Sequence, residues 1–235
     1  MFSRMAATQV TFLEYRQRSG WGGPRKGAGP KPRGRRGIIH HVRRDRFEGL
    51  AAGHVTLRVR EGVPSLRDRR LVEELRRSFG QVCERGDFRL VHYSILNDHL
   101  HLIVEAENSH ALACGMKAVG ARVARAVKRV FGWRGPVMLG RYHLRVLKSF
   151  RQVRNALAYV LLNARRHAAK HARRAKVSWR IDPASSGVSF DGWKGGAAGG
   201  ASARCGTAGV ARPRSYALTE GWRRHGLISP LETPG

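Results

Sequence analysis

The pattern of apolar and polar residues predicts an α+β fold, in which an antiparallel sheet carries helices on one face and a further helix follows. Four stretches alternate apolar and polar residues with a period of two, which is typical of half-buried strands. Three other stretches repeat apolar residues every three to four positions, which is typical of helices packed on a core. The resulting order is β-α-β-β-α-β-α between about residues 47 and 175.

The first predicted strand and helix lie between residues 54 and 86. Residues 54–60 alternate cleanly, with Val55, Leu57 and Val59 on one side. The chain then turns, and Ser65, with Asp68 three residues later, fits the N-cap of a helix. Gly86 ends this helix. Its apolar stripe consists of Val72, Leu75, Phe79 and Val82.

The next two predicted strands, 88–96 and 99–106, are joined by Asn97 and Asp98, a pair that favours a turn. Ser109 is the expected N-cap of the second helix. A fourth strand at 141–147 and a helix over about 150–171 complete the order. The buried stripe of the second helix is Leu112, Met116, Val119, Val123, Val127 and Val130. A βαββαβ order of this length is typical of a ferredoxin-like sandwich.

The charge of the chain is strongly unbalanced. It has 235 residues, with 45 Lys and Arg against 16 Asp and Glu, which gives a net charge of +29. Folding does not require this imbalance and self-repulsion makes it costly, so a polyanionic partner, most simply nucleic acid, is expected. Three widely spaced cysteines and the lack of a signal peptide or long apolar helix predict a cytoplasmic, nucleoid-associated protein without a membrane partner.

Composition divides the chain into three parts. Residues 1–46 are rich in Gly, Pro and Arg with little to bury, so we expect a flexible basic arm along nucleic acid rather than a merely solubilising tail. Residues 47–175 form the predicted folded domain. In the tail, 176–235, a Gly- and Ala-rich low-complexity stretch lies among aromatic residues that are able to dock on the core.

Basic residues gather on one side of the second helix. Arg122, Arg125 and Arg129 share this side, with Lys117 nearby, and no acidic residue is interleaved. A basic helix side is often only a solvated surface, but the single sign of charge favours a surface that contacts phosphates. The other predicted DNA contacts are Arg141, Arg166 and Lys170.

Two pairs of residues suggest a chemical site. His99 and His101 are two apart on a strand and therefore share one face. Tyr159 and Asn163 are four apart on the last helix and also share a face. Two such histidines are more often ordinary strand residues, and such a tyrosine is more often a packing residue. The predicted layout nevertheless allows all four side chains to meet.

These residues resemble a known family. The run from Asn97 to Val104 resembles the His-hydrophobe-His (HUH) motif of the single-tyrosine transposases of bacterial insertion sequences and their REP-associated relatives. The run from Tyr159 to Asn163 is similar to that family's helical Tyr-x-x-x-Asn/Gln element, and Gly221 to Gly226 resembles a tail motif of one subgroup.

The resemblance implies a mechanism. His99, His101 and Asn163 would hold one divalent ion, Mg²⁺ or Mn²⁺, a donor set that suits these ions better than closed zinc coordination. Tyr159 would attack a phosphodiester of single-stranded DNA, often a hairpin, to give a 5′-phosphotyrosine and a free 3′-OH. Rejoining would need no ATP, because one phosphodiester is exchanged for another.

Other functions remain open at this point. One alternative is a related HUH endonuclease of replication initiation or conjugation. Another is a non-catalytic or domesticated nucleic-acid-binding protein on the same fold, which would not depend on Tyr159. The family includes monomers and homodimers. Glu105 shares the strand face of the histidines, and we expect it to be a surface carboxylate rather than a support for them. We expect His92 and His143 to be surface or DNA-facing residues.

Overall fold

The computed structural model describes residues 46–163, 181–196 and 209–234. The predicted basic arm therefore lies outside the described residues apart from Arg46, as do Arg166 and Lys170. None of the helices among the described residues is long and apolar enough to cross a membrane.

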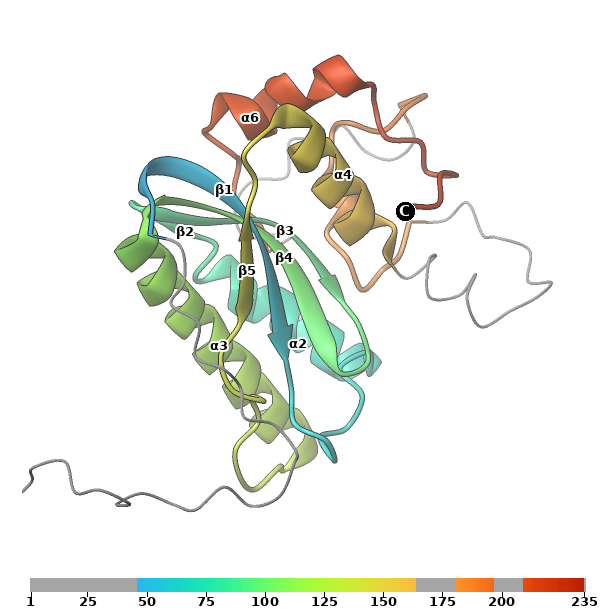
Figure 1. Cartoon of the computed structure of the whole chain (residues 1–235). Coiled ribbons are helices and arrows are strands. Elements are labelled where there is room, and N and C mark those ends of the chain that lie inside the picture. The colour runs from blue at the N-terminus through green and yellow to red at the C-terminus, as the bar shows by residue number, and fades with distance from the viewer. Residues whose placement is uncertain (1–45, 164–180, 197–208, 235) are drawn as a thin grey trace, which may run out of the picture. The chain divides into compact units, whose positions relative to one another are not determined.

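Five strands form one antiparallel sheet in the order β2-β3-β4-β1-β5 (Figure 1). Their bounds are β1 (Glu48–Arg58), β2 (Glu84–Arg85), β3 (Phe88–Ile95), β4 (His99–Asn108) and β5 (His143–Val146). The predicted α+β fold with its βαββαβ order is confirmed. The short edge strand β2 is additional, and β1 begins six residues before the predicted strand, because its first residues are exposed and do not alternate.

Helices α2 (Arg69–Gly80) and α3 (Ser109–Phe131) cover one face of the sheet, which we call the helical face (Figure 1). Alternate strand residues such as Leu57, Leu90 and Leu102 pack there against the apolar stripes of both helices. Full burial of a Leu or Phe side chain stabilises a fold by roughly 1.5–3 kcal/mol. The contact is close: a Cβ added at Gly115 of α3 would lie 2.2 Å from a ring atom of Phe88.

Both predicted N-caps are displaced. The cap of α2 is Asp68, whose carboxylate accepts from the backbone N–H of Leu71, while the Ser65 hydroxyl donates to Asn97 instead. The cap of α3 is Asn108, whose side chain accepts from two backbone N–H groups of the first turn. Ser109 is occupied elsewhere, because its hydroxyl accepts from the backbone N–H of Phe47.

Helix α4 (Phe150–Leu161) lies on the opposite face of the sheet, which we call the site face (Figure 1). The Ser149 side chain caps its first turn by accepting from the Gln152 N–H. The buried side of α4, including Val153, Leu157 and Val160, packs with Ala52, Val91 and Ile103 of the sheet. The predicted extension of this helix to residue 171 falls partly outside the described residues.

The described parts of the tail pack on this same face. They contain the short helices η1 (Gly187–Ser189), α6 (Tyr216–Thr219) and η2 (Gly221–His225). Five apolar side chains of the tail join the α4 cluster: Phe190, Trp193, Leu218, Trp222 and Ile228. Helix α4 is therefore held between the sheet and the tail.

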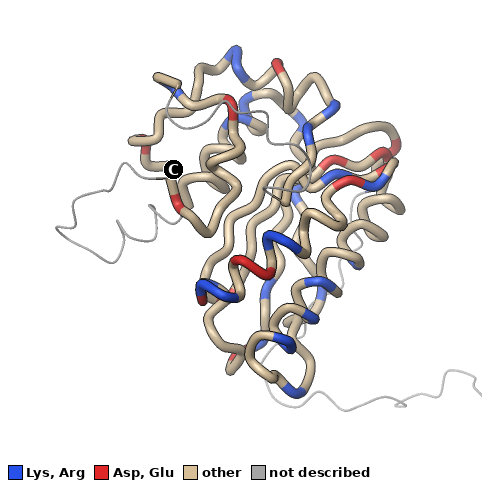
Figure 2. Tube along the Cα trace, turned by 180° about the vertical axis from the view of Figure 1, so that it is seen from behind, with Lys and Arg blue, Asp and Glu red and all other residues tan. Residues whose placement is uncertain are grey.

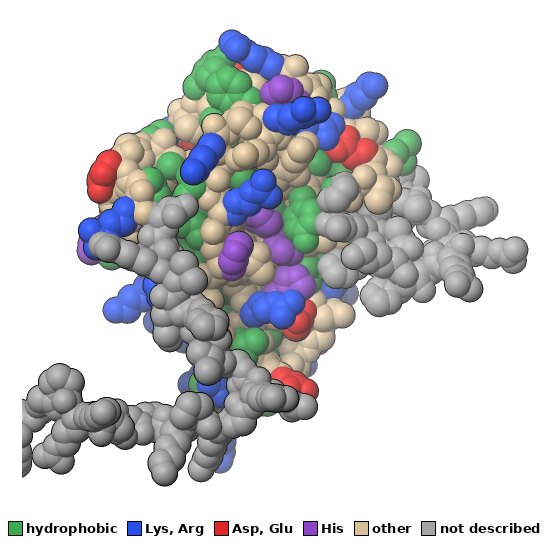
Figure 3. Space-filling model, in the orientation of Figure 1, with side chains coloured by type: hydrophobic (Ala, Val, Ile, Leu, Met, Phe, Trp, Pro, Cys, Tyr) green, Lys and Arg blue, Asp and Glu red, His purple; other side chains and the backbone are tan. Residues whose placement is uncertain are grey.

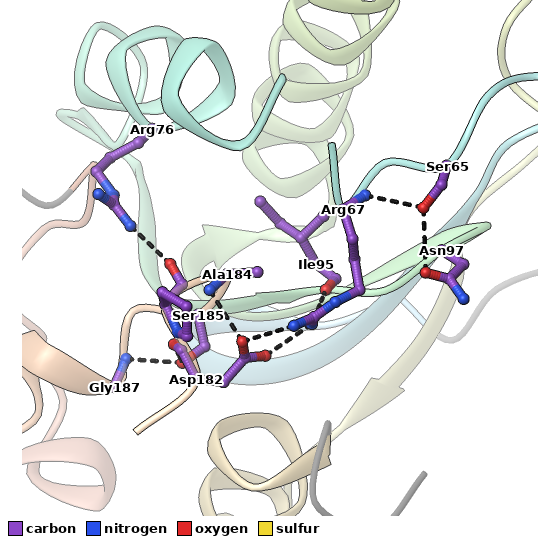
Figure 4. Close-up of polar contacts among 10 residues, drawn as sticks. Ser65, Arg67, Arg76, Ile95, Asn97, Asp182, Ala184, Ser185 and Gly187 are labelled. Carbon is purple, nitrogen blue, oxygen red and sulfur yellow. Dashed lines mark hydrogen bonds and ion pairs between the residues drawn. The ribbon is translucent and has the colours of Figure 1, made fainter. Parts of the chain in front are cut away.

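Two arginines fasten the tail to the body. The Arg67 guanidinium donates to both carboxylate oxygens of Asp182 at 2.8 Å and to the carbonyl of Ile95 at 2.9 Å (Figure 4). Arg154 of α4 donates to both carboxylate oxygens of Glu232 at 2.7 Å. Paired hydrogen bonds between ionised groups are among the stronger polar contacts in proteins.

Candidate functional site

Strand β4 presents His99 and His101 on the site face. Their Nε2 atoms lie 3.2 Å apart, and their rings meet at right angles with centroids 4.8 Å apart. Nδ1 of His99 lies 2.6 Å from a carboxylate oxygen of Asp98. A neutral His99 that donates this hydrogen bond carries its lone pair on Nε2. Each ring can therefore direct one nitrogen to a common point.

The charge of Asp98 is maintained by its neighbours. Burial alone raises the pKa of this carboxyl, but the hydrogen bond and electrostatic attraction of His99 and the charge of Arg58 outweigh it, so the pKa lies below its ordinary value. An ionised Asp98 is the acceptor that the Nδ1–H of His99 requires.

Strand β1 supports His101 from the other side. Nδ1 of His101 lies 3.1 Å from both Nε2 of His54 and the hydroxyl of Thr56. Burial, with smaller effects of the Arg145 and His143 charges, lowers the pKa of His54 to about 4. His54 is therefore neutral at neutral pH, and its Nε2 or the Thr56 hydroxyl can accept from His101. This arrangement leaves the His101 Nε2 lone pair directed toward His99.

Helix α4 brings Tyr159 to the histidines. Its ring packs edge-on against His101 with centroids 5.0 Å apart, and against His54 with centroids 5.6 Å apart. Asn163 follows four residues later and is fully buried. Neither polar atom of its side chain has a hydrogen-bond partner among the described residues. A buried amide left unpaired costs about 1–3 kcal/mol, so it indicates a missing partner.

The donor set fits a hard divalent ion. Two imidazole nitrogens converge, both rings have their second nitrogen in a polar contact, and a buried amide lacks a partner. In the described part of the chain, no three His, Cys, Asp or Glu side chains are grouped so that they could hold a metal ion. An ion bound by His99 and His101 would therefore need a third protein ligand of another kind, and the unpaired Asn163 amide is a group of that kind.

Histidine side chains lie together near the middle of this face, with Lys and Arg side chains around them (Figure 3). Sequence reasoning missed the contributions of His54 and Thr56. A usable signal was present, because both occupy the polar positions of a strand that pairs with β4: Thr56 lies opposite His101 and His54 opposite Ile103.

The predicted DNA-contacting residues do not gather at this site. Lys117, Arg122, Arg125 and Arg129 belong to α3, on the opposite face of the sheet. Arg141 is exposed two residues before β5. The structure thus brings together His99, His101 and Tyr159 but separates them from the basic helix.

The basic side of α3 is also less uniform than its own sequence indicates. Arg129 donates to Glu74 of α2, and Arg122 donates to Gln81. The three α3 arginines line a cavity of about 290 Å³ beside α2, which Glu74 and Arg77 share. Figure 2 shows acidic and basic residues side by side on the helical layer. The basic side of α3 contains no acidic residue of its own, but α2 places the carboxylate of Glu74 beside it.

Two surface expectations are wrong. Glu105 is fully buried, and its carboxylate oxygens accept from the backbone N–H groups of Arg214 and Ser215, both at 2.7 Å. His92 is buried beneath the tail, with Nδ1 3.1 Å from the Ser186 hydroxyl, and burial lowers its pKa to about 4. In both cases the tail covers a strand position that would otherwise face water.

Comparison with known proteins finds a family model that matches part of the chain. Among curated proteins, no sequence matches this chain. Two solved structures are similar in shape. One, a REP-associated tyrosine transposase bound to a REP hairpin, is 17% identical with a TM-score of 0.47, and the match covers 63% of this chain and 82% of that one. The other, a candidate transposase from Deinococcus radiodurans, is 18% identical with a TM-score of 0.35, and the match covers 42% and 80%. The resemblance noted in the histidine motif is confirmed at the level of sequence, since residues 50–142 match the family described as transposase IS200-like.

Proposed function

We propose that this protein is a transposase that cleaves and rejoins single-stranded DNA through Tyr159. One observation carries the proposal. The Tyr159 ring packs 5.0 Å from that of His101, whose Nε2 lies 3.2 Å from the Nε2 of His99. A phenol beside two converging imidazoles combines a nucleophile with ligands for an ion that stabilises phosphate charge.

The cofactor we propose is a single Mg²⁺ or Mn²⁺ ion held by His99, His101 and Asn163. The unpaired buried amide of Asn163 and the outward contacts of both imidazoles support this assignment. When bound, such an ion polarises the phosphodiester and offsets negative charge on the leaving oxygen.

The residues of the chain perform the exchange of bonds. The Tyr159 oxygen forms a bond to phosphorus, the bond from phosphorus to the 3′ oxygen breaks, and the phenol proton ends on the released 3′-OH. The products are a 5′-phosphotyrosine and a free 3′-OH. Because the number of phosphodiester bonds is unchanged, a 3′-OH can reverse the reaction without ATP.

The DNA we propose is a hairpin with a single-stranded extension. The net charge of +29 supports a polyanionic partner. Single strands suit a site that is assembled on an open sheet face with histidine and tyrosine rings, on which bases can stack. Lys117, Arg122, Arg125, Arg129 and Arg141 would contact other phosphates of the same DNA, together with Arg166 and Lys170.

Covalent trapping tests the proposal. The protein is incubated with 5′- and 3′-labelled hairpins in Mn²⁺, Mg²⁺ or EDTA and run on a denaturing gel. We expect labelled protein only with the 3′-labelled strand, only with metal, and not with Tyr159→Phe. Tyr216→Phe, which alters an exposed tyrosine of the tail, is the control and should keep the adduct.

Binding without an adduct across a broad pool of hairpins would overturn the catalytic proposal. The non-catalytic nucleic-acid-binding protein considered above would then remain.

A further inference from the structure

Two arginines on the site face influence the pKa values of Asp98 and His54 but have not been assigned a contact with DNA. Arg58 is the last residue of β1 and lies opposite His99 of β4. Arg145 of β5 lies opposite His54 of β1. Residues directly opposite each other in an antiparallel pair point to the same face of the sheet. Both arginines therefore share the face of the histidines, and both are exposed.

Arg58 and Arg145 lie on opposite sides of the histidine site. His101, Thr56 and His143 form one row across three strands. Arg58 lies in the next row on one side of it, and Arg145 in the next row on the other side. The two outer rows are four residue steps apart on β1, which is about 13 Å along the strand. The ring of Tyr159 contacts His54 and His101 and so lies between the two arginines.

The two guanidinium groups also differ in their pairing from the arginines that hold the body and the tail together. Arg67, Arg154 and Arg223 are paired with carboxylates, as are Arg89 and Arg129. Arg58 and Arg145 make no ion pair and no side-chain hydrogen bond in the part of the chain that the structure describes. Arg58 is attracted to the Asp98 carboxylate without forming an ion pair with it. The two positive charges beside the histidines are therefore not neutralised by a paired carboxylate, and a bound polyanion removes the cost of that arrangement.

We propose that Arg58 and Arg145 clamp the backbone phosphates on either side of the phosphodiester that faces Tyr159. This clamp deepens the proposed function and rests on it. Each planar guanidinium donates two parallel hydrogen bonds to a phosphate, which fixes the direction of the strand as well as its position. The central phosphodiester is thereby held between the histidine pair and the tyrosine.

The salt dependence of DNA binding tests directly whether Arg58 and Arg145 contact phosphates. A fluorescent hairpin with a single-stranded extension is titrated with Tyr159→Phe protein, which cannot react, between 50 and 300 mM salt, roughly the range over which such contacts are screened. Adding Arg58→Gln or Arg145→Gln should each lower the slope of log Kd against log salt by about 0.7, and the pair by about 1.4. A hairpin stem without the extension should show no change in slope.

Two further variants separate local contacts from general charge. Arg85→Gln removes an exposed arginine from edge strand β2, which β3 and β4 separate from β1, and should leave the slope unchanged. The double variant Arg58→Lys with Arg145→Lys should have the wild-type salt slope. With Tyr159 present, its rate of adduct formation at saturating DNA should remain low, because an ammonium group cannot donate two parallel hydrogen bonds to one phosphate.

The outcomes distinguish the two proposals. If the wild-type protein forms the tyrosine adduct while Arg58→Gln with Arg145→Gln retains the wild-type slope and rate, the clamp is wrong and the proposed function stands. An equal loss of slope in Arg85→Gln also overturns the clamp. If the wild-type protein forms no adduct, the catalytic proposal fails, whatever the slopes show.

Discussion

The two faces of the sheet bury different kinds of residue. The helical face is apolar throughout its contact with α2 and α3, and the charged residues of those helices lie at its outer surface. The site face buries His92, His101, Glu105 and Asn163 among its apolar residues. All eight residues of β3 are buried, so this strand has no solvent-facing side.

The two faces therefore place different demands on the residues that they bury. On the helical face, burial of apolar area supplies most of the packing, and the buried Tyr93 hydroxyl finds its partner in Arg76. On the site face, each buried polar group needs a partner or a ligand. Glu105 and His92 find theirs in the tail, and His101 finds its partners among other site residues. For Asn163, neither side-chain polar atom has a partner among the described residues.

The largest effect on stability is expected on the helical face, from a single methyl group. Gly115→Ala would place a Cβ within 2.2 to 2.6 Å of three ring atoms of Phe88, so we expect a net destabilisation of about 1–3 kcal/mol. Gly120→Ala on the same helix meets nothing within 4 Å and should stabilise by up to about 1 kcal/mol. Urea unfolding of both variants measures the difference, and similar values would contradict the close packing described.

On the site face, Glu105→Gln tests the buried carboxylate. The amide nitrogen of glutamine cannot accept from a backbone N–H, so one of the two bonds to residues 214 and 215 is lost, at a cost of about 2 kcal/mol. Limited proteolysis should then cleave more readily near residue 214. Glu107→Gln, at the exposed end of the same strand, is the control, and equal sensitivity of the two variants would show that the carboxylate does not hold the tail.

The smallest effect is a pH dependence specific to the site face. The pKa of His92 is about 4 in the folded chain against an ordinary 6.5, so below pH 6.5 the unfolded chain binds a proton that the folded chain does not. Its contribution to stability is complete above pH 6.5, decreases as the pH falls toward 4, and is lower by about 1.4 kcal/mol at pH 5.5. His92→Gln removes this titration. The loss of unfolding free energy between pH 7.5 and 5.5 should therefore be smaller in the variant, and equal losses would refute the assignment.

The sequence could predict the helical face but not the tail. Alternation in β1 and β4 and the stripes of α2 and α3 are local patterns, and they gave the fold and its element order. The same alternation assigned Glu105 and His92 to the surface. An alternating pattern shows which residues share a face of the sheet, but it does not show which part of the chain covers that face. The tail contacts join residues about a hundred positions apart, such as Glu105 and Ser215, and no local pattern encodes them.

The candidate site was predictable in part. His99, His101 and Tyr159 were selected by spacing and resemblance, and the structure places them in contact. The supporting positions of His54 and Thr56 depend on the register between β1 and β4, which follows from strand pairing rather than from either strand alone. The acidic neighbour of the basic side of α3 was not predictable for a related reason, since Glu74 comes from another helix.

The packing of α4 against the tail has a consequence for the order in which parts of the site form during synthesis. A chain leaves the ribosome from its N-terminus, and earlier segments fold first. The sheet, both its helices and Tyr159 emerge before residues 181–234, which supply Trp193, Trp222 and Glu232 to hold α4. During synthesis, the histidine pair can therefore form on the sheet while the tyrosine helix is still unsupported on its outer side. A nascent chain at that stage has its histidine pair in place before Tyr159 is held against it, so the contact between Tyr159 and His101 is secured only as the tail is completed.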